Sequence, residues 1–258
     1  MTSASRPACL ITGSATGIGA ECARLFASNG WNVGICSLDD ETRLDAENVV
    51  VECQLRGAET LLITLNVTND ENCRAAAAAM MERFGRIDAL INCAGTTRFI
   101  PHADLDALPS REFTRTYDVN VIGTFQMIRA CREALSTSGR GAVVNLSSIA
   151  GTAGLGSSVA YAASKGAVST LTLSLARALA PSIRVNAIAP GYVVGGLPSR
   201  VLAADKIAAV EAKYLQTQAL PRCLHVDEVA SMAYVLAVSA PGMTGEIIRM
   251  DNGLHLYA

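Results

Sequence analysis

The sequence predicts an α/β fold in which one doubly wound parallel sheet of about seven strands is flanked by helices. Short apolar runs alternate with amphipathic segments at a spacing of about 25 residues, which is typical of strand–helix units. Half of the 258 residues are hydrophobic and 17% are charged, which is enough for one large core. Because no linker or shift in composition divides the chain, we expect a single domain over 1–258.

The first half of the chain supplies four of the strands. Helical spacing continues through Ser28 after the first strand, the next helix ends at Gly57, and Asp70 lies in the first turn of an alanine-rich helix. The expected strands are short apolar runs at 8–12, 31–37, 60–65 and 87–92, and the two later helices are expected at 42–56 and 70–84.

The second half begins with an irregular stretch over 96–108 and continues with one long helix over 110–135. A glycine- and serine-rich loop over 151–158 then precedes a helix that Tyr161 opens. That helix stops at Pro181, because proline cannot continue a helix. Strands are expected on both sides of this loop and helix, at 141–146 and 183–189.

The segment 192–220 departs from the alternation of strands and helices. It fits either an extra pair of helices packed flat on the domain or a mobile lid. We favour a lid for the substrate site, because the segment follows directly from the carboxyl end of a strand. A helix over 227–239 and a strand over 246–250 complete the expected fold.

The turn after the first strand has the spacing Gly-x-x-x-Gly-x-Gly, from Gly13 through Gly17 to Gly19. Glycines allow the backbone to approach a pyrophosphate closely, and the N-terminus of the following helix offers free N–H groups. A simple turn is the alternative. The strand before the loop and the helix after it favour nucleotide binding.

The end of the second strand bears on the identity of the cofactor. In dinucleotide-binding folds an acidic residue near this position holds the ribose 2′-hydroxyl. Here the position is Ser37, followed by Leu38 and then by Asp39 and Asp40. Serine leaves room for a 2′-phosphate and so favours NADP, whereas no arginine stands beside it and the two aspartates would repel that phosphate. NAD and NADP therefore both stay open.

Tyr161 and Lys165 are four residues apart on one expected helix, so their side chains lie on the same face. A nearby ammonium favours the ionised phenol, which would lower the pKa of Tyr161 and let it exchange a proton near neutral pH. The spacing alone also fits a solvated surface pair. Ligands bind at the carboxyl ends of strands in open α/β sheets, so we expect Gly13, Gly95 and Ser148 to gather there with Tyr161.

Composition disfavours several other functions. A net charge of −2 without a run of lysine or arginine argues against nucleic-acid binding, and no apolar run approaches the length of a membrane span. Residues 1–7 lack the apolar region of a signal peptide, so we expect a cytoplasmic protein. The eight cysteines form no Cys-x-x-Cys pair and the three histidines share no ligand spacing, which favours buried free thiols over disulfides or a metal site.

Taken in order, these motifs resemble the short-chain dehydrogenase/reductase family over essentially the whole chain, and within it the 3-oxoacyl-acyl-carrier-protein reductase-like proteins. The matching motifs are Thr12-Gly13-x-x-x-Gly17-Ile18-Gly19, Asn92-Cys93-Ala94-Gly95 where the family usually has Asn-Asn-Ala-Gly, Asn120, Ser148 thirteen residues before Tyr161, Lys165, and Pro190-Gly191. Besides Cys93 and Ser37, three positions depart from the family pattern. Thr16 stands where many NADP enzymes carry a basic residue, Asn66 where aspartate is common, and Gly195 where threonine is frequent.

The resemblance implies a Rossmann-type domain with NAD or NADP and a catalytic set of four residues. Tyr161 would exchange the alcohol proton, and Ser148 would hydrogen-bond the substrate oxygen. Lys165 would lower the Tyr161 pKa and hold the nicotinamide ribose, while Asn120 would anchor a water that connects Lys165 to solvent. The implied cofactor contacts are Gly13, Ala15, Thr16, Gly17, Ile18, Gly19, Ser37, Leu38, Asn66, Val67, Asn92, Ala94, Gly95, Tyr161, Lys165, Pro190, Gly191 and Val193.

The implied reaction is hydride transfer between the nicotinamide and a small-molecule ketone or secondary alcohol. The alternative is a non-catalytic dinucleotide-binding sensor or scaffold, which would not need all four catalytic residues. Substrate contacts are expected in 96–102, 149–158 and 192–220. Arg98 could meet an anionic substrate, but Arg98 and His102 are both more readily explained as solvated loop residues. Family members pair through helices that correspond to 110–135 and 159–180, which implies a homotetramer or dimer.

Overall fold

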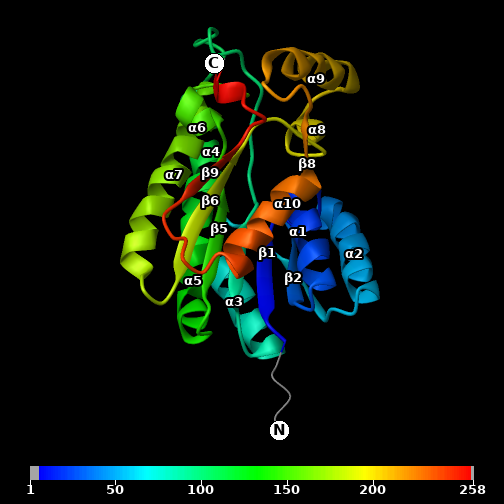
Figure 1. Cartoon of the computed structure of the whole chain (residues 1–258), viewed down its shortest axis with the longest axis vertical. Coiled ribbons are helices and arrows are strands. Elements are labelled where there is room, and N and C mark those ends of the chain that lie inside the picture. Colours follow the sequence, from blue (N-terminus) through cyan, green and yellow to red (C-terminus); the bar gives the residue numbers. More distant parts are fainter. Residues whose placement is uncertain (1–5, 257–258) are drawn as a thin grey trace.

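The computed structural model describes residues 6–256. Its central sheet has seven parallel strands in the order β3-β2-β1-β4-β5-β6-β9 (Figure 1). The strands are β1 (Ala8–Thr12), β2 (Asn32–Ser37), β3 (Thr60–Thr64), β4 (Ala89–Asn92), β5 (Ala142–Leu146), β6 (Arg184–Pro190) and β9 (Ile247–Met250). The predicted doubly wound sheet is thus confirmed, and its order reverses between β1 and β4, where such folds bind ligands.

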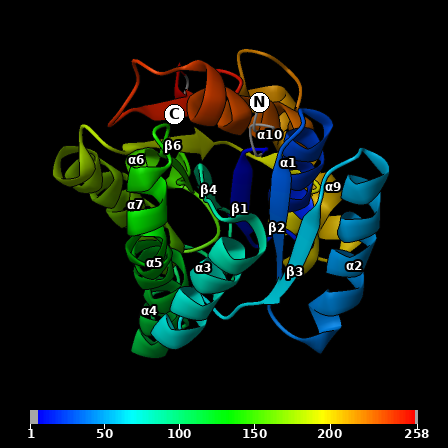
Figure 2. The same ribbon diagram turned by 90° about the horizontal axis from the view of Figure 1, so that it is seen from below.

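Helices cover both faces of the sheet, and each face has its own core (Figure 2). One face is covered by α1 (Gly17–Ser28), α2 (Asp40–Leu55) and α10 (Val226–Tyr234). The other is covered by α3 (Asp70–Phe84), α5 (Thr124–Thr137) and α7 (Val159–Leu179). A parallel sheet covered on both sides explains why the strands are continuous apolar runs.

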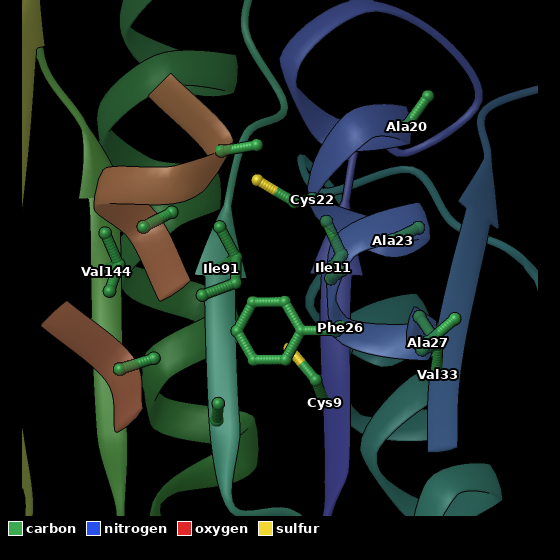
Figure 3. Packing of buried hydrophobic residues seen from close by; sticks show 14 of the residues in the cluster. Cys9, Ile11, Ala20, Cys22, Ala23, Phe26, Ala27, Val33, Ile91 and Val144 are labelled. Atoms are coloured by element: carbon green, nitrogen blue, oxygen red, sulfur yellow. The ribbon is translucent and has the colours of Figure 1, made fainter. Parts of the chain in front are cut away.

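The core under α1 is organised around Phe26. Its ring is fully buried and meets the rings of Trp31 and Tyr234 edge-on, with centroids 5.1 Å apart in both pairs. Figure 3 shows the ring reaching from α1 over the strands that carry Ile11 and Ile91. Truncating a buried ring of this kind costs about 3–5 kcal/mol. This packing fixes α1, and with it the glycine loop at its N-terminus, against the sheet.

The registers of neighbouring strands bring the loops after them to one level. Thr12 is paired with Asn92, and Asn92 with Asn145, so β1, β4 and β5 end side by side. The Asn92 side-chain amide donates to Asn145 Oδ1 at 2.9 Å, and the Ala94 backbone N–H donates to the Thr12 hydroxyl at 3.0 Å. These bonds hold the loop after β4 beside the glycine loop after β1.

The expected long helix over 110–135 has a different internal structure. It consists of α4 (Ser110–Tyr117), a π-helical segment over Asp118–Gly123, and then α5. π-Helical turns often mark functional sites. Here the turn contains Asn120, whose side-chain amide bonds to the backbone of Thr96 instead of facing solvent. A second π-helical segment, Val235–Ser239, follows α10 inside the helix expected over 227–239.

The prediction of a loop over 151–158 is wrong for the first residues of that range, because Ala150–Ala153 form a helical turn, α6. The backbone N–H groups of Thr152 and Ala153 donate to the Ile149 carbonyl at 3.0 and 2.9 Å. Tyr161 does not open the next helix: α7 begins at Val159, and the Ser158 hydroxyl caps it by accepting from the Tyr161 N–H at 3.2 Å. Tyr161 is therefore fixed within the first turn.

The segment 192–220 contains more regular structure than a simple lid. A two-stranded ribbon joins β7 (Val193–Val194) to β8 (Leu224–His225), and α8 (Pro198–Val201) and α9 (Ala204–Thr217) lie between them in the chain. Figure 1 shows α8 and α9 beyond one end of the sheet, so this pair does not lie flat on a sheet face. Two-residue strands carry no periodicity, which is why the ribbon could not be predicted.

Gly13 offers a test of how tightly the glycine loop is packed. It has φ +62°, and a Cβ there would lie 2.9 Å from the backbone of Ala94, whereas Gly57 has φ +84° and open space around it. We expect Gly57→Ala to lower the free energy of unfolding by about 1 kcal/mol through backbone strain. Gly13→Ala should lower it by about 3 kcal/mol, because overpacking adds to the strain. Urea unfolding measures both, and equal losses would contradict this packing.

Candidate active site

A cavity of about 720 Å³ lies at the carboxyl ends of the central strands. The loops after β1, β4, β5 and β6 form its base, and α7 and α9 contribute side walls. The predicted cofactor residues on its walls are Gly13, Thr16, Gly17, Ile18, Gly19, Ala94, Gly95, Tyr161, Lys165, Pro190, Gly191 and Val193. The other predicted contacts lie outside these walls: Ala15, Ser37, Leu38, Asn66, Val67 and Asn92.

The glycine loop has the shape that a pyrophosphate requires. A Cβ at Gly19 would lie 2.4 Å from the Gly13 carbonyl oxygen, and one at Gly17 would lie 3.0 Å from the Gly195 carbonyl oxygen. No acidic residue occurs in the first turn of α1, which begins at the cavity wall. The positive end of the helix dipole therefore faces the cavity without a competing carboxylate, which suits an anionic group.

Two buried polar atoms near the strand ends have no hydrogen-bond partner among the described residues. They are the Ser37 hydroxyl and Asn92 Oδ1. A buried polar atom costs free energy when it stays unpaired, so both atoms fit contacts to a bound polar group. Asp39, by contrast, is engaged in capping α2, since its Oδ1 accepts from the Thr42 N–H at 3.0 Å. Leu38 is exposed.

Tyr161, Ser148 and Lys165 all line the cavity. Ser148 Oγ accepts from the Ala150 N–H at 3.1 Å and donates to the Pro190 carbonyl at 3.4 Å, and the Ser148 side chain is close enough to Tyr161 to act on its pKa. Lys165 is 5% exposed, and its Nζ donates to the Leu146 carbonyl at 2.6 Å. That nitrogen lies 5.6 Å from the centroid of the Tyr161 ring. Tyr161 thus points into the cavity and toward Ser148.

The prediction that Lys165 lowers the Tyr161 pKa is wrong when only the groups of this chain act on Tyr161. Burial raises the pKa of Tyr161 to about 12, the hydrogen bond with Ser148 opposes this shift, and Tyr214 adds to it. Burial also lowers the pKa of Lys165 to about 8. The reason is that the site withdraws both side chains from water, which disfavours the charged form of each. The Lys165 amine is directed to Leu146 and not to the phenol oxygen.

Asn120 lies behind the cavity wall and connects two segments. Its Oδ1 accepts from the Thr96 N–H at 2.8 Å, and its Nδ2 donates to the Thr96 carbonyl at 3.1 Å and to Ser164 Oγ at 3.0 Å. The residue is 1% exposed and does not line the cavity. These bonds fit the structural interpretation of a satisfied core amide, and the role of Asn120 in holding a water stays a prediction.

Of these two loop residues, Arg98 behaves as expected and His102 does not. Arg98 donates to Glu112 Oε1 at 3.3 Å and is absent from the cavity wall. His102 is half-buried and lines the cavity, and its Nε2 is a buried atom without a partner among the described residues. Nothing in the sequence around His102 indicates that it lines the cavity, because the position of His102 depends on how 96–108 packs against α6 and α7.

The segment 192–220, where substrate contacts are expected, includes α9, which does line the cavity, but the sequence did not identify Lys213 and Thr217 as wall residues. The Tyr192 and Tyr214 rings are stacked with centroids 5.2 Å apart, and the Tyr192 hydroxyl donates to Glu211 Oε1 at 3.2 Å. These contacts hold α9 over the loop that follows β6. A usable signal was present in the helical spacing of the residues of α9 that line the cavity, Val210, Lys213, Tyr214 and Thr217.

Three further features of the described residues concern the cysteines, possible metal ligands and possible membrane helices. All eight cysteines are free thiols and six of them are buried, as expected. Within 6–256, no group of three or more histidine, cysteine or acidic residues is placed to hold a metal ion. None of the helices in this part of the chain is both long and apolar enough to cross a bilayer.

Comparison with known proteins places this geometry in a family. Residues 13–255 match the family described as enoyl-(acyl carrier protein) reductase. The chain is 40% identical to trans-4-hydroxycyclohexanecarboxylate dehydrogenase of Sinomonas cyclohexanicum, over 95% of this chain and 91% of that one. It is 30% identical to a 3-oxoacyl-[acyl-carrier-protein] reductase of Staphylococcus aureus, over 96% and 97% of the two chains.

The fold agrees with these matches. A crystal structure from Burkholderia xenovorans, assigned to the short-chain dehydrogenases/reductases, is 48% identical with a TM-score of 0.92, over 98% of this chain and 99% of that one. The chain therefore belongs to the short-chain dehydrogenase/reductase family, with 3-oxoacyl reductase-like relatives, and is an NAD(P)-dependent oxidoreductase that acts on a ketone or secondary alcohol.

Proposed function

We propose that Tyr161 exchanges the proton of the substrate hydroxyl, that Ser148 holds the substrate oxygen, and that Lys165 binds the nicotinamide ribose. The observation that carries this assignment is that Tyr161, Ser148 and Lys165 line one cavity, with the buried Lys165 amine 5.6 Å from the centroid of the Tyr161 ring. The sensor or scaffold alternative has no support from the relatives, which are named for dehydrogenase and reductase activities.

The protonation state of Tyr161 suits the reducing direction. A bound dinucleotide supplies or accepts the hydride. With a pKa of about 12, the Tyr161 phenol keeps its proton at neutral pH and can donate it to the oxygen of a ketone as the hydride arrives. Oxidation of an alcohol needs the phenolate, whose population is small at neutral pH. We therefore propose ketone reduction as the favoured direction.

Lys165 has N–H hydrogen-bond donors that can bind a ribose. An ammonium has three N–H donors, and the Leu146 carbonyl occupies one of them. The remaining two are free to bind a pair of vicinal ribose hydroxyls at the cavity wall. The pKa of about 8 keeps the amine charged at neutral pH, so these hydrogen bonds are charge-assisted.

For the cofactor, we propose that NADP binds at least as well as NAD. Support comes from Ser37, which places a small, buried hydroxyl without a partner among the described residues where NAD-selective folds carry a carboxylate. The neighbouring Asp39 is a helix cap, which places its carboxylate toward the backbone of α2.

We also propose a cytoplasmic homo-oligomer, either a tetramer or a dimer. The free thiols fit a reducing compartment. Large apolar side chains are exposed along the α4–α5 helix and on α7, where family members associate: Phe113, Ile122, Phe125 and Leu173. Covering such residues with a second copy would remove apolar surface from water.

Replacing Tyr161 with phenylalanine tests the proposed acid directly. The proton donor is lost while the ring is kept, so we expect ketone turnover to fall by about 10²–10⁴-fold. Affinity for the dinucleotide, measured by fluorescence titration, should stay nearly unchanged. The matched control is Tyr234→Phe, which alters a tyrosine packed on Phe26 away from the cavity. Retained turnover in Tyr161→Phe would overturn the assigned role.

The pH profile of ketone reduction tests Lys165. Because burial lowers its pKa to about 8, the ammonium is present below that pH and is lost above it. We expect kcat/KM for reduction to be flat near neutral pH and to fall by about tenfold per pH unit well above pH 8. Lys165→Arg, whose guanidinium stays charged, should lack this fall in its residual activity. A wild-type profile that stays flat to pH 10 would contradict the assignment.

Ser37 tests cofactor selection. A carboxylate at this position would repel a 2′-phosphate, so Ser37→Asp should weaken NADPH binding by about tenfold or more and leave NADH binding unchanged or tighter. Ser37→Ala removes the hydroxyl without adding charge and serves as the control. Titrations of NADH and NADPH side by side measure the effect. Wild-type binding to NADH alone would refute the proposal.

A further inference from the structure

We propose that the substrate of this oxidoreductase is an acid, with an apolar body and a carboxylate that Lys213 on α9 recognises, assisted by His102. The inference builds on the proposed function, because it concerns the same cavity. It adds that the substrate carries a carboxylate at some distance from the carbonyl group that reacts.

One face of α9 lines the cavity. The residues on the wall, Val210, Lys213, Tyr214 and Thr217, follow the spacing i, i+3, i+4, i+7 and therefore share one side of the helix. The stacked rings of Tyr192 and Tyr214 keep that side directed at the cavity. Lys213 is thus the charged member of a face that otherwise carries apolar, aromatic and hydroxyl groups.

Several apolar side chains also line the cavity. They are Phe99 from the loop after β4, Leu155 from the turn after α6, Leu197 just before α8, Pro198 at the start of α8, and Leu254 near the C-terminus. Such a surface favours a hydrocarbon body by the hydrophobic effect. It offers nothing to select one hydrocarbon from another except shape, so polar groups at the wall must supply most of the specificity.

The charges on the cavity wall are of one sign. Among the described residues that line it, no aspartate or glutamate occurs, and the two lysines are Lys165 and Lys213. Lys165 is bonded to the Leu146 carbonyl. The Lys213 ammonium has no hydrogen bond or ion pair with another described residue. The nearby Glu211 accepts from Tyr192, and it lies two positions along α9, on another side of the helix.

His102 lines the same cavity from a different segment and adds a second polar group to it. Its Nε2 is buried and lacks a partner within 6–256, while the ring lines both the main cavity and a smaller one between α6 and α7. An imidazole nitrogen in this position can donate a hydrogen bond to a carboxylate oxygen when it carries the proton.

The expected size of the effect is moderate. Lys213 is exposed, so it lies where the cavity opens to solvent, and screening weakens its attraction for an anion. A hydrogen bond to a charged group is nevertheless stronger than a neutral one. We therefore expect a preference of about tenfold or more for an acid over a neutral molecule of the same shape.

The experiment compares each keto acid with its methyl ester. The probes are 4-oxocyclohexanecarboxylate and 6-oxoheptanoate, which place the carboxylate at different distances from the carbonyl. We expect wild-type kcat/KM to be about tenfold or more higher for at least one acid than for its ester. Lys213→Met should abolish that preference by raising KM for the acid while leaving the ester unchanged. His102→Leu should reduce it more weakly.

Lys206→Met is the matched control. It removes the same charge from the same helix, but Lys206 does not line the cavity, so the acid preference should persist. The inference is overturned if wild type shows no acid preference, reduces neither probe, or loses acid and ester turnover equally in Lys213→Met. Failure of the proposed function looks different: Tyr161→Phe would then keep turnover of the ester or of other neutral ketones.

Discussion

The geometry of the site depends on the hydrogen bond between the Lys165 amine and the Leu146 carbonyl at the end of β5. This bond fixes a buried cation below the Tyr161 ring, within the same turn of α7 that aligns Tyr161 with Ser148. Ser158 contributes by capping the helix, which sets where that turn begins. The end of β5, the Ser158 cap and the buried Lys165 amine thus together set the positions of Tyr161 and Ser148.

Burial then determines the protonation states. Neither side chain takes its charge from the other, since desolvation raises the pKa of Tyr161 to about 12 and lowers that of Lys165 to about 8. At neutral pH the result is a neutral acid above a cation. In the proposed function, this arrangement supplies a proton to a ketone oxygen and charged donors to a ribose, and it favours the reducing direction.

The sequence was sufficient for the seven strands of the central sheet and for the main helices that cover it. The glycine loop, the apolar strands and the bounds of α3 at Asp70 and Phe84 follow from local patterns, so they could be predicted. The π-helical turn around Asn120 and the ribbon of β7 and β8 could not, because they depend on contacts between distant segments. The same holds for the pKa of Tyr161, which reflects burial by surrounding segments.

Two wall residues that lie in the expected substrate segments, but were not assigned a role there, show the same limit. Lys213 lies on a helix whose spacing was visible, but only the stacking of Tyr214 on Tyr192 shows which face meets the cavity. His102 lies in a stretch without periodicity, and its buried nitrogen is defined by tertiary packing. Substrate selection is thus the property that is hardest to predict from a single sequence, because it depends on the segments that close the cavity.

The most direct test of this account is the titration of the Lys165 amine itself. In protein labelled with ¹³C at the lysine ε-carbon, the resonance of Lys165 can be assigned by its loss in Lys165→Arg and followed against pH. Burial predicts a midpoint of about 8, well below the ordinary value of 10.5. A midpoint at that ordinary value would show a solvated amine and would contradict the claim that desolvation sets the charges of the site.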